Sequence, residues 1–155
     1  MADTYDVQIR SVPPDRATSH TVPLSQVVLQ HHRTDGIQID AQPLSGGHLL
    51  HLAVAGCVFN DLYRLAAERG IRLTDVLVSA TGDFAGERPT VSTGIRYQVF
   101  VSGEASEEQL QELVLEVGTI ASIPNVLRRG TTVTLSDVRV DATRGARGAP
   151  KEGDD

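Results

Sequence analysis

The chain has little sulfur, few aromatic residues and almost no lysine, and each shortage narrows what the protein can be. Its 155 residues include one cysteine, one methionine and no tryptophan, with three phenylalanines and three tyrosines. A single cysteine excludes an intrachain disulfide and a cysteine-rich metal site. With so few aromatic residues the core must be built from aliphatic side chains, which the 40% hydrophobic content allows.

Acidic residues outnumber basic ones, 20 against 14, for a formal net charge of -6 at pH 7. This balance argues against nucleic acid as the main partner. The basic charge is almost all arginine, with Lys151 the sole lysine, which we attribute to a GC-rich bacterial genome. Residues 1–6 lack the basic-then-apolar pattern of an export signal, so we expect a cytoplasmic protein.

The other predicted elements are arranged around one long hydrophobic stretch, residues 46–70. Residues 46–70 are typical of a single long helix, which Ser45 can cap at its start and Gly70 can end in a left-handed conformation. At 1.5 Å per residue, about 23 residues span roughly 35 Å, enough to cross a small domain. Between Leu49 and Phe59 nearly every side chain is apolar, which predicts a buried helix.

The polar interruptions of this stretch, at His51, Asn60 and Asp61, argue against a membrane span. We therefore expect no membrane partner. The helix also carries Cys57, the only cysteine of the chain.

Helical spacing decides which side chains Cys57 can meet. At 100° per residue it shares one stripe with four residues of the same helix: Leu50, Asp61, Arg64 and Glu68. His48 and His51 point to other sides, so neither can act locally as a base for Cys57 of its own chain. Asp61 disfavours the thiolate and Arg64 favours it. Position alone is also compatible with a buried, inert cysteine that acts as a small hydrophobe.

The motif around this cysteine, Leu-Leu-His-Leu-Ala-Val-Ala-Gly-Cys, resembles the corresponding helix of the OsmC/Ohr family of thiol peroxidases. The elements that follow come in the family's order: a strand pair at 74–80 and 94–101, an acidic amphipathic helix from Ser106, a proline-containing break at 122–127 and a last strand at 131–140. The resemblance covers roughly residues 4–140. It implies an α+β, OsmC-like fold, with antiparallel sheets around a long buried helix and an intertwined homodimer.

The chain departs from the family pattern at three places. Ile123 stands where the family has its second, resolving cysteine, before Pro124. Gly46 and Gly47 stand where a Pro-Glu pair normally opens the long helix. The family's catalytic arginine lies in the N-terminal segment, where the resemblance points to Arg16 by its offset from the cysteine. Arg10 remains an alternative.

The remaining pattern predicts one domain over residues 1–142 and a disordered tail over 143–155. Alternating residues predict a strand from Tyr5, a turn at 13–15, a second strand with residues 20–24 at an edge, a turn at 34–36 and a third strand through Ile37 and Ile39. The segment 82–94 is expected to be a long loop. Further on, Ser106 and Gln109 form a capping box, and a change of strand parity predicts a bulge near Ser136.

Other chemistries find weaker support in the sequence. His31 and His32 would point to opposite faces of a strand, and His48 and His51 could converge on a helix without a third ligand at a known spacing, so no metal or other cofactor is predicted. Gly46 and Gly47 lack the context of a phosphate-binding loop. No Gly-x-Ser-x-Gly elbow indicates a hydrolase.

Three functions stay open at this point. The first is an enzyme in which Cys57, activated by an arginine such as Arg16, reduces organic hydroperoxides and is restored by an external thiol. The second is a dimeric protein that uses the same fold to bind or transform another apolar small molecule, for example in a biosynthetic pathway. The third is a non-catalytic relic.

Overall fold

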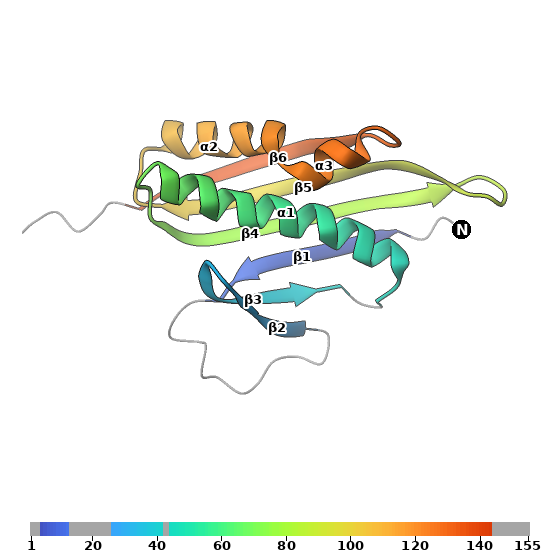
Figure 1. Cartoon of the computed structure of the whole chain (residues 1–155), viewed down its shortest axis with the longest axis horizontal. Helices are drawn as coiled ribbons and strands as arrows, with labels where there is room; N and C mark the ends of the chain where they lie inside the picture. Colours follow the sequence, from blue (N-terminus) through green and yellow to red (C-terminus); the bar gives the residue numbers. More distant parts are fainter. Residues whose placement is uncertain (1–3, 13–25, 42–43, 144–155) are drawn as a thin grey trace, which may run out of the picture.

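The computed structural model describes residues 4–12, 26–41 and 44–143. It contains six strands and three helices within these residues, coloured along the chain in Figure 1. In chain order the elements are β1 (Tyr5–Ser11), β2 (Gln26–His31), β3 (Thr34–Asp40), α1 (Gly46–Glu68), β4 (Leu73–Ala85), β5 (Val91–Gly103), α2 (Glu107–Ile120), α3 (Ser122–Leu127) and β6 (Val133–Ala142).

All six strands join one sheet in the order β2-β3-β1-β4-β5-β6. Neighbouring strands are antiparallel except β5 and β6, which are parallel. The sequence led us to expect separate antiparallel sheets, so the structure differs in these two respects. The parallel pair follows from the connection, because α2 and α3 carry the chain back across one face of the sheet before β6 begins (Figure 1).

The long helix α1 forms as its sequence predicts and lies on one face of the sheet, roughly along β4 and β1 (Figure 1). Ser45 is its N-cap residue but makes no side-chain capping bond, because its Oγ is hydrogen-bonded to Nδ1 of His48 at 2.8 Å. At the other end Gly70 adopts φ +67°, the left-handed conformation expected of it. The helix start is therefore fixed by an imidazole rather than by a capping hydroxyl.

The core lies between α1, α2 and the sheet face that they cover. The predicted inward faces of the strands are buried, with Val76, Val78 and Ala80 in β4 and Ile95 and Tyr97 in β5. In α2 the predicted apolar stripe is buried as well, apart from Ile120, which is exposed. The capping box of Ser106 and Gln109 is present.

Several local predictions can be compared directly with the structure. The turn expected at 34–36 lies instead at His32–Arg33, and the segment expected as a loop at 82–94 is largely strand, because β4 and β5 continue to Ala85 and from Val91. The bulge is confirmed: Tyr97 pairs with Leu135 and Gln98 with Asp137, which leaves Ser136 as the extra residue. The predicted turn at 13–15, the strand at 20–24 and nearly all of the predicted tail lie outside the described residues.

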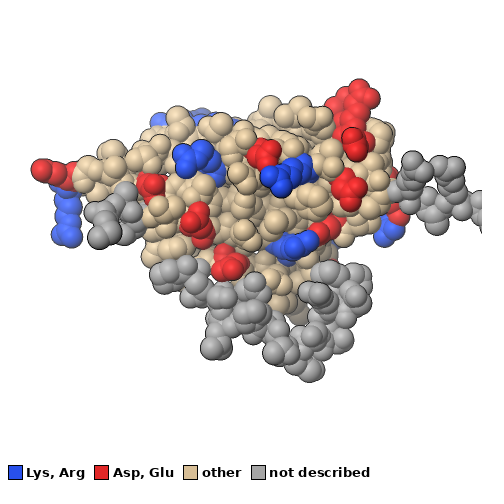
Figure 2. Space-filling view, turned by 180° about the vertical axis from the view of Figure 1, so that it is seen from behind, with Lys and Arg blue, Asp and Glu red and all other residues tan. Residues whose placement is uncertain are grey.

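The other face of the sheet carries charged side chains of both signs. Figure 2 shows this face from behind, with acidic and basic groups interspersed rather than gathered into one patch. In β1 the burial alternates, so that Val7 and Ile9 face the helices while Arg10 lies on the charged face. A sheet with one apolar and one charged face needs cover on one side only.

The helix α1 is long and apolar enough to cross a membrane by length and composition. Half of its most apolar stretch is buried inside the fold, as in the core helix of a folded domain.

Gly82 is a position where the packing leaves no room for a side chain. An added Cβ would lie 2.5 Å from the carbonyl oxygen of Gly94 and 2.5 Å from Nε2 of His51. We expect Gly82→Ala to lower the free energy of unfolding by about 1–3 kcal/mol through overpacking. Gly46→Ala is the control, because nothing lies within 4 Å of its added Cβ, and it should change stability by less than about 1 kcal/mol. Urea unfolding of both variants measures the difference, and equal effects would contradict the packing.

Candidate functional site

Cys57 is partly buried in the middle of α1, and its sulfur contacts polar groups from two elements. The thiol donates to Oδ2 of Asp61, one turn further along the helix, over 3.9 Å. The backbone N–H of Ile123, at the start of α3, donates to Sγ over 3.5 Å. The Asp61 carboxylate can take up a proton, and the Ile123 N–H stabilises negative charge on sulfur. Cys57 is therefore more than an apolar filler of the core.

The contact with Ile123 connects the site to the expected family pattern. Ile123 stands where the resemblance places the resolving cysteine, and the structure brings this position against Cys57. The proline-containing break predicted here is the short helix α3, in which Pro124 is buried. A cysteine at position 123 would thus lie beside Cys57.

Asp61 is buried, with 8% of its surface exposed, and is held by Arg64 of the next turn. Arg64 donates from Nε to Oδ1 of Asp61 at 3.2 Å and from Nη1 to Glu68 at 3.1 Å. These bonds raise the pKa of the Arg64 guanidinium above its ordinary value, chiefly through Asp61. The stripe predicted from helical spacing is therefore formed, and within it Asp61 lies between the sulfur and Arg64.

Of the two candidate arginines, Arg10 and Arg16, the structure describes only Arg10. Arg10 lies on the charged face of the sheet and pairs with Asp75 of β4, with 2.5 Å between Nη2 and Oδ2. Because α1 covers the opposite face, Arg10 does not approach Cys57 of its own chain. Arg16 lies outside the described residues.

The histidines of α1 are structural neighbours of Tyr5 rather than of Cys57. His51 is 1% exposed, donates from Nδ1 to the carbonyl oxygen of Gly47 at 2.7 Å, and stacks on the Tyr5 ring with centroids 5.6 Å apart. His48 meets the same ring edge-on at 5.1 Å. Among the residues that the structure describes, Nε2 of His51 finds no hydrogen-bond partner.

The histidines of the β2–β3 hairpin lie elsewhere. His31 bonds through Nδ1 to the Thr34 hydroxyl at 3.1 Å, and burial together with the neighbouring His32 and Arg33 lowers its pKa. Among the residues that the structure describes, no three potential metal ligands come together.

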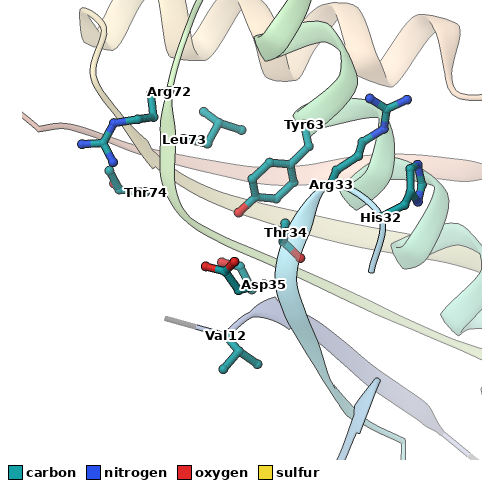
Figure 3. A pocket seen from close by; sticks show the side chains of 10 residues that line it. Val12, His32, Arg33, Thr34, Asp35, Tyr63, Arg72, Leu73 and Thr74 are labelled. Atoms are coloured by element: carbon teal, nitrogen blue, oxygen red, sulfur yellow. The ribbon is translucent and has the colours of Figure 1, made fainter. Parts of the chain in front are cut away.

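One open pocket of about 610 Å³ lies between α1, the β2–β3 turn and the start of β4, as Figure 3 shows. Tyr63 points its ring into it, while the guanidinium groups of Arg33 and Arg72 lie on opposite sides of that ring. Burial raises the pKa of the Tyr63 hydroxyl. Both arginines bond elsewhere, Arg33 to Asn60 and Arg72 to Glu104. Cys57 does not line this pocket.

Sequence reasoning did not find this pocket or the contact between Cys57 and the backbone of Ile123. The position of Tyr63 on α1 follows from helical spacing, but nothing in the sequence brings the segment 72–74 next to the turn at 32–35. The backbone donor is invisible in a sequence, because every residue except proline offers one.

Solved structures with the same fold have very different sequences. A hypothetical protein from Aquifex aeolicus aligns with a TM-score of 0.57 at 13% identity, over 80% of this chain and 93% of that one. An OsmC-like protein from Mycoplasma pneumoniae gives 0.51 at 12% identity over 79% and 96%. The organic hydroperoxide resistance protein OsmC from Legionella pneumophila gives 0.50 at 14% identity over 77% and 100%. At these identities the likeness shows a shared fold.

No curated protein matches by sequence. The family comparison does find a match: residues 40–136 fit the OsmC-like proteins, over a stretch that contains α1, Cys57 and Ile123. Because that stretch is more than half of the chain and the fold agrees with it, the protein belongs to the OsmC-like family.

Proposed function

We propose that the protein is a thiol-dependent peroxidase that reduces organic hydroperoxides with Cys57. The observation that carries the proposal is the contact between Cys57 and position 123, the position where the resemblance places the family's second cysteine. Family membership supports it, and one protein of the same fold is described as an organic hydroperoxide resistance protein.

The reaction needs no second cysteine in the chain. Sulfur attacks the distal oxygen of the hydroperoxide, the O–O bond breaks, and the electron pair leaves with the alkoxide, which takes up the thiol proton and departs as an alcohol. Cys57 becomes a sulfenic acid. One external thiol then forms a mixed disulfide and releases water, and a second regenerates the Cys57 thiol and leaves as a disulfide.

The surface beside the sulfur suits an organic substrate. Ile123 is 38% exposed and Val126, one turn later in α3, is 63% exposed. Exposed aliphatic side chains next to a reactive group offer contact area to the alkyl part of a hydroperoxide. Arg16 is the residue we propose to stabilise the thiolate and the departing alkoxide, since Arg10 faces away from α1 of its own chain.

The alternative, binding of another apolar small molecule, finds less support in the described residues. The pocket at Tyr63 has the volume of a small-molecule site but a largely polar and charged lining. Cys57 lies outside it. This pocket is therefore a poor match to the apolar ligand that the alternative requires.

We propose further that the protein acts as a homodimer formed through α1. Leu49 is 54% exposed and Ala53 is also exposed, and nothing lies within 4 Å of a Cβ added to Gly56. These three residues follow each other at intervals of four and three, on one stripe of the helix. A second copy would cover that stripe together with the exposed apolar residues of α3, and would place the Cys57 sites at the subunit interface.

The redox role of Cys57 can be tested by trapping. After cumene hydroperoxide is added to the purified protein, a dimedone probe should label Cys57 as sulfenic acid, detected by mass spectrometry of the intact chain. Turnover should require an added thiol, and the preferred thiol is identified by comparing monothiols and dithiols. Cys57→Ser should abolish turnover and labelling.

The serine variant must be folded for this result to count, and the similar volumes of the two side chains predict an unchanged circular dichroism spectrum. A wild-type protein that gives neither labelling nor thiol-dependent consumption of hydroperoxide would contradict the peroxidase proposal.

The two arginines predict opposite results. Arg16→Gln should slow the reaction of Cys57 with cumene hydroperoxide by tenfold or more, since removal of an electrostatic donor at a reacting oxygen typically costs about 10²–10³ in rate. Arg10→Gln is the matched control and should leave the rate unchanged, because its partner is Asp75 on the charged face. Stopped-flow measurements under pseudo-first-order conditions decide between them, and a loss in Arg10→Gln alone would reverse the assignment.

Assembly through α1 predicts a species of twice the 16.6 kDa chain mass in sedimentation velocity at low micromolar concentration. Ala53→Arg should shift the protein to monomer by placing a charge on the proposed interface. Ala85→Arg makes the same change at an exposed alanine at the end of β4 and should remain dimeric. A monomeric wild type, or a dimer unaffected by Ala53→Arg, would refute this interface.

A further inference from the structure

The carboxylate of Asp61 is in an unusual position for a protein that has to activate a thiol. It is buried, and its two oxygens have different partners: Oδ1 accepts from Arg64 and Oδ2 accepts from the Cys57 thiol. The thiolate is the reactive form of cysteine, and a neighbouring cation is the usual device that generates one. Here the charged group in contact with the sulfur is a carboxylate, so its role calls for another explanation.

A carboxylate next to the sulfur can serve the reaction, because a proton has to move from the thiol to the leaving group. Breaking the O–O bond of an alkyl hydroperoxide releases an alkoxide, a strongly basic leaving group that needs a proton as it departs. The thiol has to lose a proton in the same step. A carboxylate within reach of the sulfur can take up the first proton and supply the second.

We propose that Asp61 is the proton carrier of the Cys57 site, an inference that rests on the peroxidase function proposed above. Oδ2 accepts the thiol proton as sulfur attacks the distal oxygen. The O–O bond breaks, its electron pair moves to the proximal oxygen, and the Asp61 carboxyl group passes the proton to that oxygen. The products are Cys57 sulfenic acid, an alcohol and the original carboxylate, so no other reactant is consumed.

Two further contacts fit this role. Arg64 holds Oδ1 at 3.2 Å and fixes the carboxylate, which leaves Oδ2 directed at the sulfur. The Ile123 N–H stabilises negative charge on Sγ during the transfer. The S–O distance of 3.9 Å is long for proton transfer, and such contacts commonly shorten when the substrate binds.

The test compares two oxidants that differ in their leaving groups. Cumene hydroperoxide releases an alkoxide, which needs a proton, whereas peracetic acid releases acetate, which does not. Asp61→Asn should slow the reaction of Cys57 with cumene hydroperoxide by roughly 100-fold or more, the usual contribution of general acid–base catalysis. The rate with peracetic acid should fall much less, and so should alkylation by iodoacetamide, because neither acetate nor iodide needs a proton as it departs.

Glu68→Gln is the matched control. It removes a carboxylate that also binds Arg64 but has no contact with the sulfur, so both oxidation rates should remain at the wild-type level. Asp61→Glu, which keeps a carboxylate, should recover part of the rate with cumene hydroperoxide.

Wild-type protein supplies a test that does not depend on the folding of any variant. Across cumene hydroperoxides with ring substituents, the rate should depend only weakly on the acidity of the departing alcohol, because the proton is supplied in the same step. A steep dependence would overturn the proposal, as would equal slowing of Asp61→Asn with both oxidants or no slowing with either. Wild-type protein that reacts with neither oxidant would instead refute the peroxidase function itself.

Discussion

The burial of α1 is the constraint on which the rest of the structure depends. A 23-residue helix whose surface is mostly apolar must be shielded from water. The sheet covers one side of it, and α2 and α3 cover another. These contacts fix the rotation of the helix about its axis. That rotation decides that Cys57 faces the start of α3 and that Arg10 of β1 lies on the far face of the sheet. The chemistry of the site is thus a consequence of how a hydrophobic helix is packed.

Periodicity alone was sufficient for most of the fold. The alternation in β1 and β5 and the helical spacing in α2 placed their buried residues correctly apart from Ile120, because one apolar face must turn toward the core in each element. Periodicity was insufficient to predict how β6 pairs with β5. Whether β6 runs parallel or antiparallel to β5 depends on the path of the chain through α2 and α3, and no residue within β6 records that path.

In the candidate site, only the arrangement of residues on α1 could be predicted from helical geometry. Helical geometry placed Asp61 beside Cys57 and excluded His48 and His51 as local partners, because positions on one helix are fixed relative to each other. Ile123 could be paired with Cys57 only through the family resemblance, since the two residues are far apart in sequence. The pocket around Tyr63 required four segments to meet, and its lining follows only from the tertiary structure.

The proposed chemistry has to work with one cysteine and with Gly46 and Gly47, rather than a glutamate, at the start of α1. In a two-cysteine enzyme the partner thiol removes the sulfenic acid, whereas here position 123 contributes a backbone N–H and an exposed aliphatic side chain. Beside the charge proposed for Arg16, the helix α1 supplies the ion pair of Asp61 and Arg64, and the Asp61 carboxylate of that pair contacts the sulfur.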